Sequence, residues 1–395
     1  MFHVKHFPLE HVHRSARLGV IAVAALLILV ASGCGSVSVP EGWAAPLTAG
    51  EHLLIGNGNG SVSAFRRDNL TNPVWTFPAD VKKDSGWFSF LGGSKGELAT
   101  LKGLYATPVI AKVDGRDRVI LAAYSGEIIA IDLLTGQRSE GWPQSINVGG
   151  HVVATPAFDG KQLFIATQAG TVRTVNVATG ELSTKLLVQS DERIWSSPIL
   201  HDGKLYVADL ARHIRAVDAT SGEVRWERTL SGAAAGDITL AGDLLLVPTL
   251  GNRLLALSRA DGAERWKFTA DNWLWARPLA TSDTVYLASA SGAGYALDLA
   301  TGTQRWKFDG VQSETRATPV LLADTLVLAT DNGTILGLDP ATGKERWQQH
   351  PAGNPRLLAD PLVIESTILY TSKKGDIYQV KPSEQGAVAR LFQRG

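Results

Sequence analysis

The side chains that most often carry chemistry are sparse in this chain of 395 residues. Cys34 is its only cysteine, so the chain can form neither an internal disulfide nor a cysteine-rich zinc site. Four of the nine histidines fall at the N-terminus, and the other five lack the paired spacing of metal ligands. No Gly-x-Ser-x-Gly nucleophile elbow occurs, and the sequence brings no pair of carboxylates together. We therefore predict no catalytic residue, no metal site and no cofactor, and only the position of Cys34 calls for a chemical explanation.

Cys34 follows a segment that is typical of an export signal. Basic residues occur within residues 1–17, and an uncharged apolar run covers residues 18–30. This run is too short to span a bilayer as a mature helix, but it fits the hydrophobic region of a signal peptide. The small residues 31–33 then lead directly to Cys34, an order that resembles the bacterial lipobox, although Ala31 stands where leucine is usual.

This order predicts a lipoprotein signal peptide over residues 1–33 and a lipidated tether over residues 34–43. Cys34 would be diacylated as the first mature residue, and two acyl chains anchor a protein stably to a membrane. The protein would then be extracytoplasmic, on the outer membrane if the host has one and otherwise on the outer face of the cell membrane. The alternative is an ordinary secretory signal with an incidental cysteine.

The charge balance excludes two classes of partner. Lys and Arg together number 38, as do Asp and Glu. Removing the three basic residues and one acidic residue of the first 17 leaves 35 basic and 37 acidic residues. Such a chain has no basic field for nucleic acid and is not a polybasic membrane binder.

A repeat of about 40 residues fills the rest of the chain and decides the fold. Its clearest copy begins at Ala317 and reads ATPVLLADTLVLATDNGTILGLDPATGKERW. In five units a proline precedes a glycine by 14 residues, as Pro319 precedes Gly333. In the fifth unit we assign Asp237 to the proline position and Gly251 to the glycine position. The repeats then start at residues 46, 108, 156, 198, 237, 278, 319 and 361.

Each unit is predicted to hold four antiparallel strands. Short apolar strands lie around the proline and before the glycine turn, and a third follows that turn. A Thr-Gly or Ser-Gly turn then precedes a fourth strand that carries a tryptophan. A lone four-stranded sheet cannot bury both faces, so the units must stack around an axis. We predict an all-β, eight-bladed β-propeller over residues 44–395. All eight units look complete, which leaves the closure of the ring open.

Tryptophans recur at one place in the repeat, eight residues after an Asp or Ser. A row of aromatic rings can stack on bases or sugars, but a fixed place in the repeat favours a structural role. We expect each ring to pack on the adjacent blade while its indole N–H finds a backbone acceptor. The predicted docking residues are Trp226, Trp266, Trp306 and Trp347.

Those residues resemble the tryptophan-docking repeat of PQQ-type propellers. The stretches DPATGKERW, ending at Trp347, and DLATGTQRW, ending at Trp306, are close to its pattern. The resemblance covers residues 44–393, and with the lipobox the layout is similar to the BamB family of outer-membrane β-barrel assembly lipoproteins. This resemblance implies a non-catalytic propeller scaffold that binds another protein, an envelope assembly component.

Two alternatives to this function remain. One is a PQQ-dependent dehydrogenase, but that enzyme group typically carries an adjacent cysteine pair, and this chain has neither such a pair nor a Cys-x-x-Cys-His haem motif. The other is a generic anchored propeller with an unrelated partner, since one fold hosts many functions.

Arginines and tryptophans precede the proline position in several units. Loops at this place should gather on one face, near the central channel, and Arg and Trp are enriched at interface hot spots. The BamB resemblance implies that such loops meet the partner and matches Arg193 to an arginine of that family, whereas its acidic companions have no clear match. The alternative is a solvated channel whose charges pair with one another. The candidate partner-binding residues are Arg193, Trp195, Trp275, Arg277, Arg316 and Arg356.

An insertion at residues 78–104 is the second candidate surface. It contains Trp87, Phe88, Phe90 and Leu91 in a Gly- and Ser-rich context. These side chains either cover the propeller or form an exposed apolar patch.

Overall fold

The protein is described here by a computed structural model. It covers residues 42–58, 60–78, 101, 103–311 and 313–394. Cys34, the predicted signal peptide and residues 79–100 of the insertion lie outside these described residues. Within them, no helix has the length and apolar character needed to cross a bilayer.

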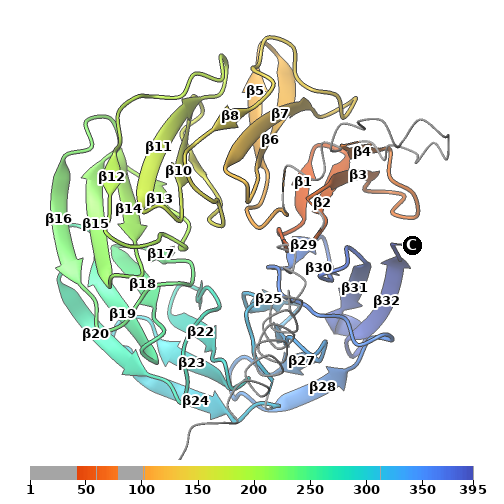
Figure 1. Ribbon diagram of the computed structural model, residues 1–395. Helices are drawn as coiled ribbons and strands as arrows, with labels where there is room; N and C mark the ends of the chain where they lie inside the picture. The colour runs from red at the N-terminus through yellow and green to blue at the C-terminus, as the bar shows by residue number, and fades with distance from the viewer. Residues whose placement is uncertain (1–41, 59, 79–100, 102, 312, 395) are drawn as a thin grey trace, which may run out of the picture. The chain divides into compact units, whose positions relative to one another are not determined.

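Eight four-stranded antiparallel sheets follow one another around a ring, which confirms the predicted propeller (Figure 1). In each blade the strands pair in chain order, with the first strand nearest the central hole and the fourth at the periphery. A 3-10 turn, η2 (Pro382–Glu384), interrupts the last blade.

Blade 1 holds β1 (Leu47–Ala49), β2 (His52–Gly56), β3 (Val62–Arg66) and β4 (Trp75–Phe77). Blade 2 holds β5 (Val109–Val113), β6 (Arg116–Ala122), β7 (Glu127–Asp132) and β8 (Ile146–Asn147). Blade 3 holds β9 (Ala157–Phe158), β10 (Gln162–Ala166), β11 (Thr171–Asn176) and β12 (Val188–Gln189).

The remaining five blades have the same layout. Blade 4 holds β13 (Ile199–His201), β14 (Lys204–Ala208), β15 (His213–Asp218) and β16 (Val224–Thr229). Blade 5 holds β17 (Thr239–Ala241), β18 (Leu244–Pro248), β19 (Arg253–Ser258) and β20 (Glu264–Thr269). Blade 6 holds β21 (Leu279–Ala280), β22 (Thr284–Ala288), β23 (Gly294–Asp298) and β24 (Gln304–Phe308). Blade 7 holds β25 (Val320–Leu322), β26 (Thr325–Ala329), β27 (Ile335–Leu338) and β28 (Glu345–Gln349). Blade 8 holds β29 (Leu362–Ile364), β30 (Thr367–Thr371), β31 (Ile377–Lys381) and β32 (Ala387–Phe392).

The residue pattern of each strand follows from its radial position. Second strands such as β14 are apolar almost throughout because both of their faces are covered by neighbouring blades. In the fourth strand β16 only Trp226 is buried, and charged residues surround it. Eight clusters of buried side chains fill the eight spaces between adjacent blades of the described chain.

No strand is exchanged between the sheets of blades 8 and 1, so side-chain contacts close the ring. Leu53, Ile55 and Phe65 of blade 1 share a buried cluster with Leu369 and Ile377 of blade 8. The rings of Phe65 and Phe392 meet edge to face with centroids 5.0 Å apart.

The register of blade 5 differs from the sequence assignment by one residue. Ile199 pairs with Tyr206 in blade 4, and Thr239 pairs with Leu246 in blade 5, so Thr239 is the equivalent of Ile199. Ile238, not Asp237, therefore occupies the proline position. The glycine position likewise falls on Asn252, with φ 61°, not on Gly251. Asn tolerates this left-handed conformation better than most residues do, because its short polar side chain bonds locally, which explains why the turn survives without glycine.

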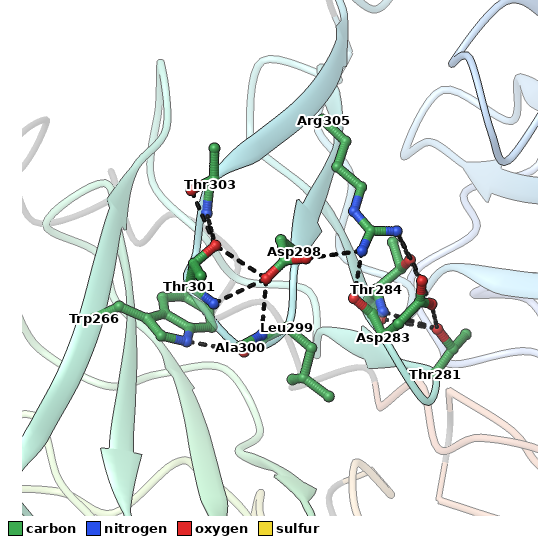
Figure 2. Close-up of polar contacts among 10 residues, drawn as sticks. All are labelled: Trp266, Thr281, Asp283, Thr284, Asp298, Leu299, Ala300, Thr301, Thr303 and Arg305. Atoms are coloured by element: carbon green, nitrogen blue, oxygen red, sulfur yellow. Dashed lines mark hydrogen bonds and ion pairs between the residues drawn. The ribbon is translucent and has the colours of Figure 1, made fainter.

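In several blades the turn between the third and fourth strands receives the tryptophan of the preceding blade, as in blade 6 (Figure 2), whereas Gly222 in the turn of blade 4 meets Leu187. Asp298 accepts the backbone N–H groups of Ala300 and Thr301 at 3.1 and 3.0 Å and so fixes the turn between β23 and β24. The Trp266 indole N–H donates to the carbonyl of Leu299 in that turn at 2.9 Å. Gly302 has φ 71°, and a Cβ there would lie 2.5 Å from the Trp266 ring, so only glycine allows the contact.

Candidate binding site at the mouth of the channel

A polar ring lines the channel wall, formed by the residue that precedes each proline position. We call it the belt tier. Where the next blade offers a side-chain oxygen, the backbone N–H of a belt residue tends to donate to it. Such bonds link Thr107 to Thr155, Thr155 to Ser197, Ser197 to Asp237 and Thr318 to Asp360, at 3.0, 3.0, 2.6 and 2.8 Å. The belt tier consists of Ala45, Thr107, Thr155, Ser197, Asp237, Arg277, Thr318 and Asp360.

The mouth tier lies two residues earlier in every blade and carries the large aromatic side chains. The rings of Trp195 and Trp275 lie 5.8 Å apart, although blade 5 separates their blades. Blade 5 contributes only Ala235 to this tier, and its small side chain leaves room for the two rings to meet. The Arg316 guanidinium lies 4.7 Å from the Trp275 ring centroid, within cation–π range. The mouth tier consists of Trp43, Tyr105, Val153, Trp195, Ala235, Trp275, Arg316 and Leu358.

A third set, the rim tier, lies two residues earlier again and is mostly exposed. Its carbonyl groups accept N–H bonds from the turn between the second and third strands, as Arg193 accepts from Leu210 at 3.0 Å. Its side chains face outward: His151 stacks on Tyr124 with ring centroids 4.4 Å apart, and Trp273 is 43% exposed. The rim tier consists of Gly103, His151, Arg193, Ala233, Trp273, Glu314 and Arg356.

The six predicted partner-binding residues therefore occupy three tiers rather than one ring of equivalent positions. Trp195, Trp275 and Arg316 belong to the mouth tier, and Arg277 belongs to the belt tier. These four line one cavity of about 730 Å³ on the channel axis. The structure places Arg193 and Arg356 on the rim outside this cavity, where Arg356 forms a bidentate pair with Asp331 at 2.7 and 2.6 Å.

Four cavity residues were missed at the sequence level: Trp43, Tyr105, Asp237 and Asp360. The sequence could have identified Trp43 and Tyr105, because each lies three residues before a repeat proline, as Trp275 does. Asp237 was hidden by its assignment to the proline position, and Asp360 was not considered among the residues before Pro361.

Two carboxylates and one guanidinium set the electrostatics of the belt tier. Arg277 approaches Asp360 at 3.4 Å, and both side chains are partly exposed. Burial raises the pKa of the Asp237 carboxyl, and the nearby charge of Asp360 raises it further, while the Ser197 N–H and Arg277 oppose the shift. Within the described residues, no group of three His, Cys, Asp or Glu side chains is arranged to hold a metal ion.

The predicted docking tryptophans all lie away from the cavity, against the neighbouring blade. Trp226, Trp266 and Trp306 donate to backbone carbonyls at 3.1, 2.9 and 2.9 Å. Trp347 packs over Gly386, but its indole N–H has no hydrogen-bond partner among the described residues. Trp75, which the sequence did not single out, donates in the same way to Leu133 at 2.9 Å.

The described end of the 78–104 insertion is part of the core. Leu101 and Leu104 are 1% exposed and pack between blades 1 and 2. The aromatic residues of the insertion lie outside the described residues.

Known proteins resemble this chain in sequence and in fold. Two curated relatives, the outer membrane protein assembly factors BamB of Escherichia coli (strain K12) and Shigella dysenteriae serotype 1 (strain Sd197), are each 26% identical to it over 211 residues. The match covers 52% of this chain and 47% of each relative, so the chain spans about half the length of the curated relatives it matches.

Two solved structures share the fold at low sequence identity. BamB from Moraxella catarrhalis superimposes with a TM-score of 0.64 at 16% identity, over 85% of this chain and 95% of that one. The computationally designed Ika8 protein gives a TM-score of 0.65 at 13% identity, over 86% and 96% of the two chains.

The family model described as outer membrane protein assembly factor BamB matches residues 44–185, 189–249 and 210–393. These matches extend over nearly the whole propeller, and the chain belongs to this family.

Proposed function

We propose that this protein is a lipid-anchored, extracytoplasmic scaffold that acts without a catalytic group and binds another protein of envelope assembly through the mouth of its channel. Membership of the BamB family supports this role, since the relatives are named as outer membrane protein assembly factors. The carrying observation is the contact of Trp195, Trp275 and Arg316 at one end of the channel.

These three side chains are of the types enriched at interface hot spots, and they are already ordered against one another. A partner that covers them loses little side-chain entropy on binding. They are also dispensable for the blade pattern, because the same tier holds Val153 and Ala235 in other blades.

The test is recovery of the partner from native membranes with a Trp275→Ala variant. Truncation of a central Trp anchor typically costs at least about 2 kcal/mol, or roughly thirtyfold in affinity. We expect an envelope assembly component to be recovered with the unchanged protein and lost with the variant, while thermal unfolding of the variant stays cooperative.

Leu134→Ala provides the control for this experiment. Leu134 is 71% exposed in the turn between β7 and β8, at the opposite end of the blades from the mouth. Its truncation should leave partner recovery unchanged. Equal recovery with Trp275→Ala would contradict the proposal.

Anchoring is tested separately by Cys34→Ala. Without the thiol no acyl chain can be attached, so the protein should move from the membrane fraction to the soluble fraction. Full retention in membranes would contradict the anchor.

A further inference from the structure

The cavity behind the mouth contains charged groups that a protein-binding rim does not require. Asp237 and Asp360 belong to belt positions at which four other blades carry Ser or Thr. A hydroxyl is sufficient for the belt hydrogen bond, as Thr155 and Ser197 show. The carboxylates therefore place charge in the cavity beyond what the belt needs.

Each carboxylate is held in place through hydrogen bonds to its own Oδ1 atom. The Oδ1 atom of Asp237 accepts the Ser197 backbone N–H at 2.6 Å. The Oδ1 atom of Asp360 accepts the backbone N–H and the hydroxyl of Thr318 at 2.8 and 2.6 Å. The Oδ2 atom of Asp360 also meets the Arg277 side chain, at 3.4 Å, and that side chain is 46% exposed.

When Asp237 and Asp360 are both ionised, the cavity lining has a net negative charge, although burial and the charge of Asp360 raise the pKa of Asp237. Arg277 offsets one of the two carboxylates. Arg316, the other cation in the lining, is already paired with Glu314, from Nε to Oε1 at 3.1 Å and from Nη2 to Oε2 at 3.2 Å. One carboxylate charge is left beside aromatic side chains, in a space of about 730 Å³.

The aromatic side chains of the mouth tier suit a cation. Trp and Tyr rings attract cations through their faces, and Trp does so most strongly. The chain uses this attraction itself, since the Arg316 guanidinium already lies over one face of Trp275. Trp43 and Tyr105 occupy the mouth tier in blades 1 and 2 and meet edge to face at 4.6 Å.

We propose that this cavity binds a guanidinium or alkylammonium group, with its stem against the mouth-tier tryptophans and its charge beside Asp237 and Asp360. The group is either a basic side chain of the bound protein or a free organic amine. The first source rests on the proposed function, whereas the cation site itself does not.

Calorimetric titration of the purified full chain tests the site with a matched pair of probes. Nα-acetyl-arginine methylamide carries the cation, and the corresponding citrulline derivative has nearly the same shape without the charge. We expect the arginine probe to bind at least about tenfold more tightly, which corresponds to 1.4 kcal/mol. Equal binding of the two probes, or no binding of either, would overturn the proposal.

Three variants test whether the charges of the belt tier cause this preference. Asp237→Asn keeps an oxygen for the Ser197 N–H but removes the charge, and it should abolish the preference for arginine. Asp331→Asn removes the same charge from the rim, outside the cavity, and should retain the preference. If both variants lost the preference for the arginine probe equally, the preference would come from the overall negative charge of the protein and not from a specific site, and the proposal would be refuted. Arg277→Gln removes the competing cation and should tighten binding of the arginine probe, and weaker binding would count against the site.

Partner recovery distinguishes the two sources. If the cation is a side chain of the partner, Asp237→Asn reduces recovery and the arginine probe competes with the partner. If it is a free amine, recovery is unchanged while the probe still binds. Loss of recovery with Trp275→Ala and no probe binding would retain the scaffold function and reject the cation site.

Discussion

The chemistry of Asp237 depends on a register shift of a single residue. At the proline position its side chain would replace a ring that packs in the blade, whereas in the belt tier it accepts the Ser197 N–H and lines the cavity. Burial and the neighbouring Asp360 both disfavour its ionised form. The carboxylate is therefore placed where its charge opposes folding at neutral pH.

Asp237→Asn should stabilise the protein at neutral pH. The pKa of Asp237 is raised above its ordinary value of 3.8 in the folded state. The stability linked to this group is therefore fully present below that value and is lost as the pH rises through the folded pKa. The amide keeps the hydrogen bond from Ser197 without the charge. Thermal unfolding should thus show a higher Tm for the variant at pH 7 and the same Tm as the parent at pH 3.

Asp331→Asn is the control for this titration. It removes a carboxylate that forms a bidentate pair with Arg356 on the rim, so no stabilisation is expected from it at pH 7. If the difference in Tm between Asp237→Asn and the parent stayed the same at all pH values, the destabilising ionisation could not be assigned to Asp237.

At the scale of the element, the recurring feature is the turn between the third and fourth strands, which receives a tryptophan from the preceding blade in several blades. Figure 2 shows Asp298 accepting backbone N–H groups within the turn and pairing with Arg305, which also reaches Asp283. The bond from Arg305 is the main reason that the pKa of Asp298 lies below its ordinary value. Its stabilising effect is present above the unfolded pKa and fades as the pH falls through the lowered folded value.

Trp306→Phe should destabilise the protein more than Trp347→Phe does. The Trp306 N–H donates to Pro340 at 2.9 Å, so phenylalanine loses both ring area and a hydrogen bond. Trp347 has no acceptor for its N–H among the described residues, and phenylalanine removes a buried unsatisfied donor there. The difference should be about 1 kcal/mol in the free energy of unfolding, the usual contribution of one hydrogen bond. Denaturant titration of both variants measures it, and equal losses would show that the hydrogen bond adds nothing beyond ring packing.

The repeat made the propeller predictable because each spacing has a local physical cause. Pro319, for example, directly precedes the inner strand β25, and Gly333 permits a positive φ of 86° in the turn that follows the second strand. The tiers were harder to predict, because side chains at nearby positions in one loop face different surroundings. Arg193 and Trp195 are two residues apart, yet one is on the rim and the other in the cavity. The contact of Trp195 with Trp275 depends on the small Ala235 in the intervening blade, and no pattern within one repeat encodes it.

At the scale of the whole molecule, the ring closes where blade 8 meets blade 1. Several blade interfaces carry a docking tryptophan, but blade 3 presents Leu187 to the turn of blade 4, and β32 of blade 8 presents Phe392 to blade 1. Arg394 adds a hydrogen bond to Ser61 across the same joint at 3.3 Å. No strand crosses between these blades, so these side-chain contacts hold the joint.

Phe392→Ala should loosen both blades that meet at this joint. The half-buried ring contacts Phe65 in blade 1, and its truncation should cost about 1–2 kcal/mol, below the 3–5 kcal/mol of a fully buried phenylalanine. Hydrogen exchange should then become faster in β1–β3 and in β30–β32 together, because local opening exposes both edges. Phe308→Ala is the matched control, since Phe308 has the same place at the end of β24 and packs between blades 6 and 7. Its interface also has Trp306 bonded to Pro340, so faster exchange there should stay confined to those two blades. If Phe392→Ala left exchange in blade 1 unchanged, the ring would be held closed by other contacts, and the aromatic pair would not be the determinant of closure.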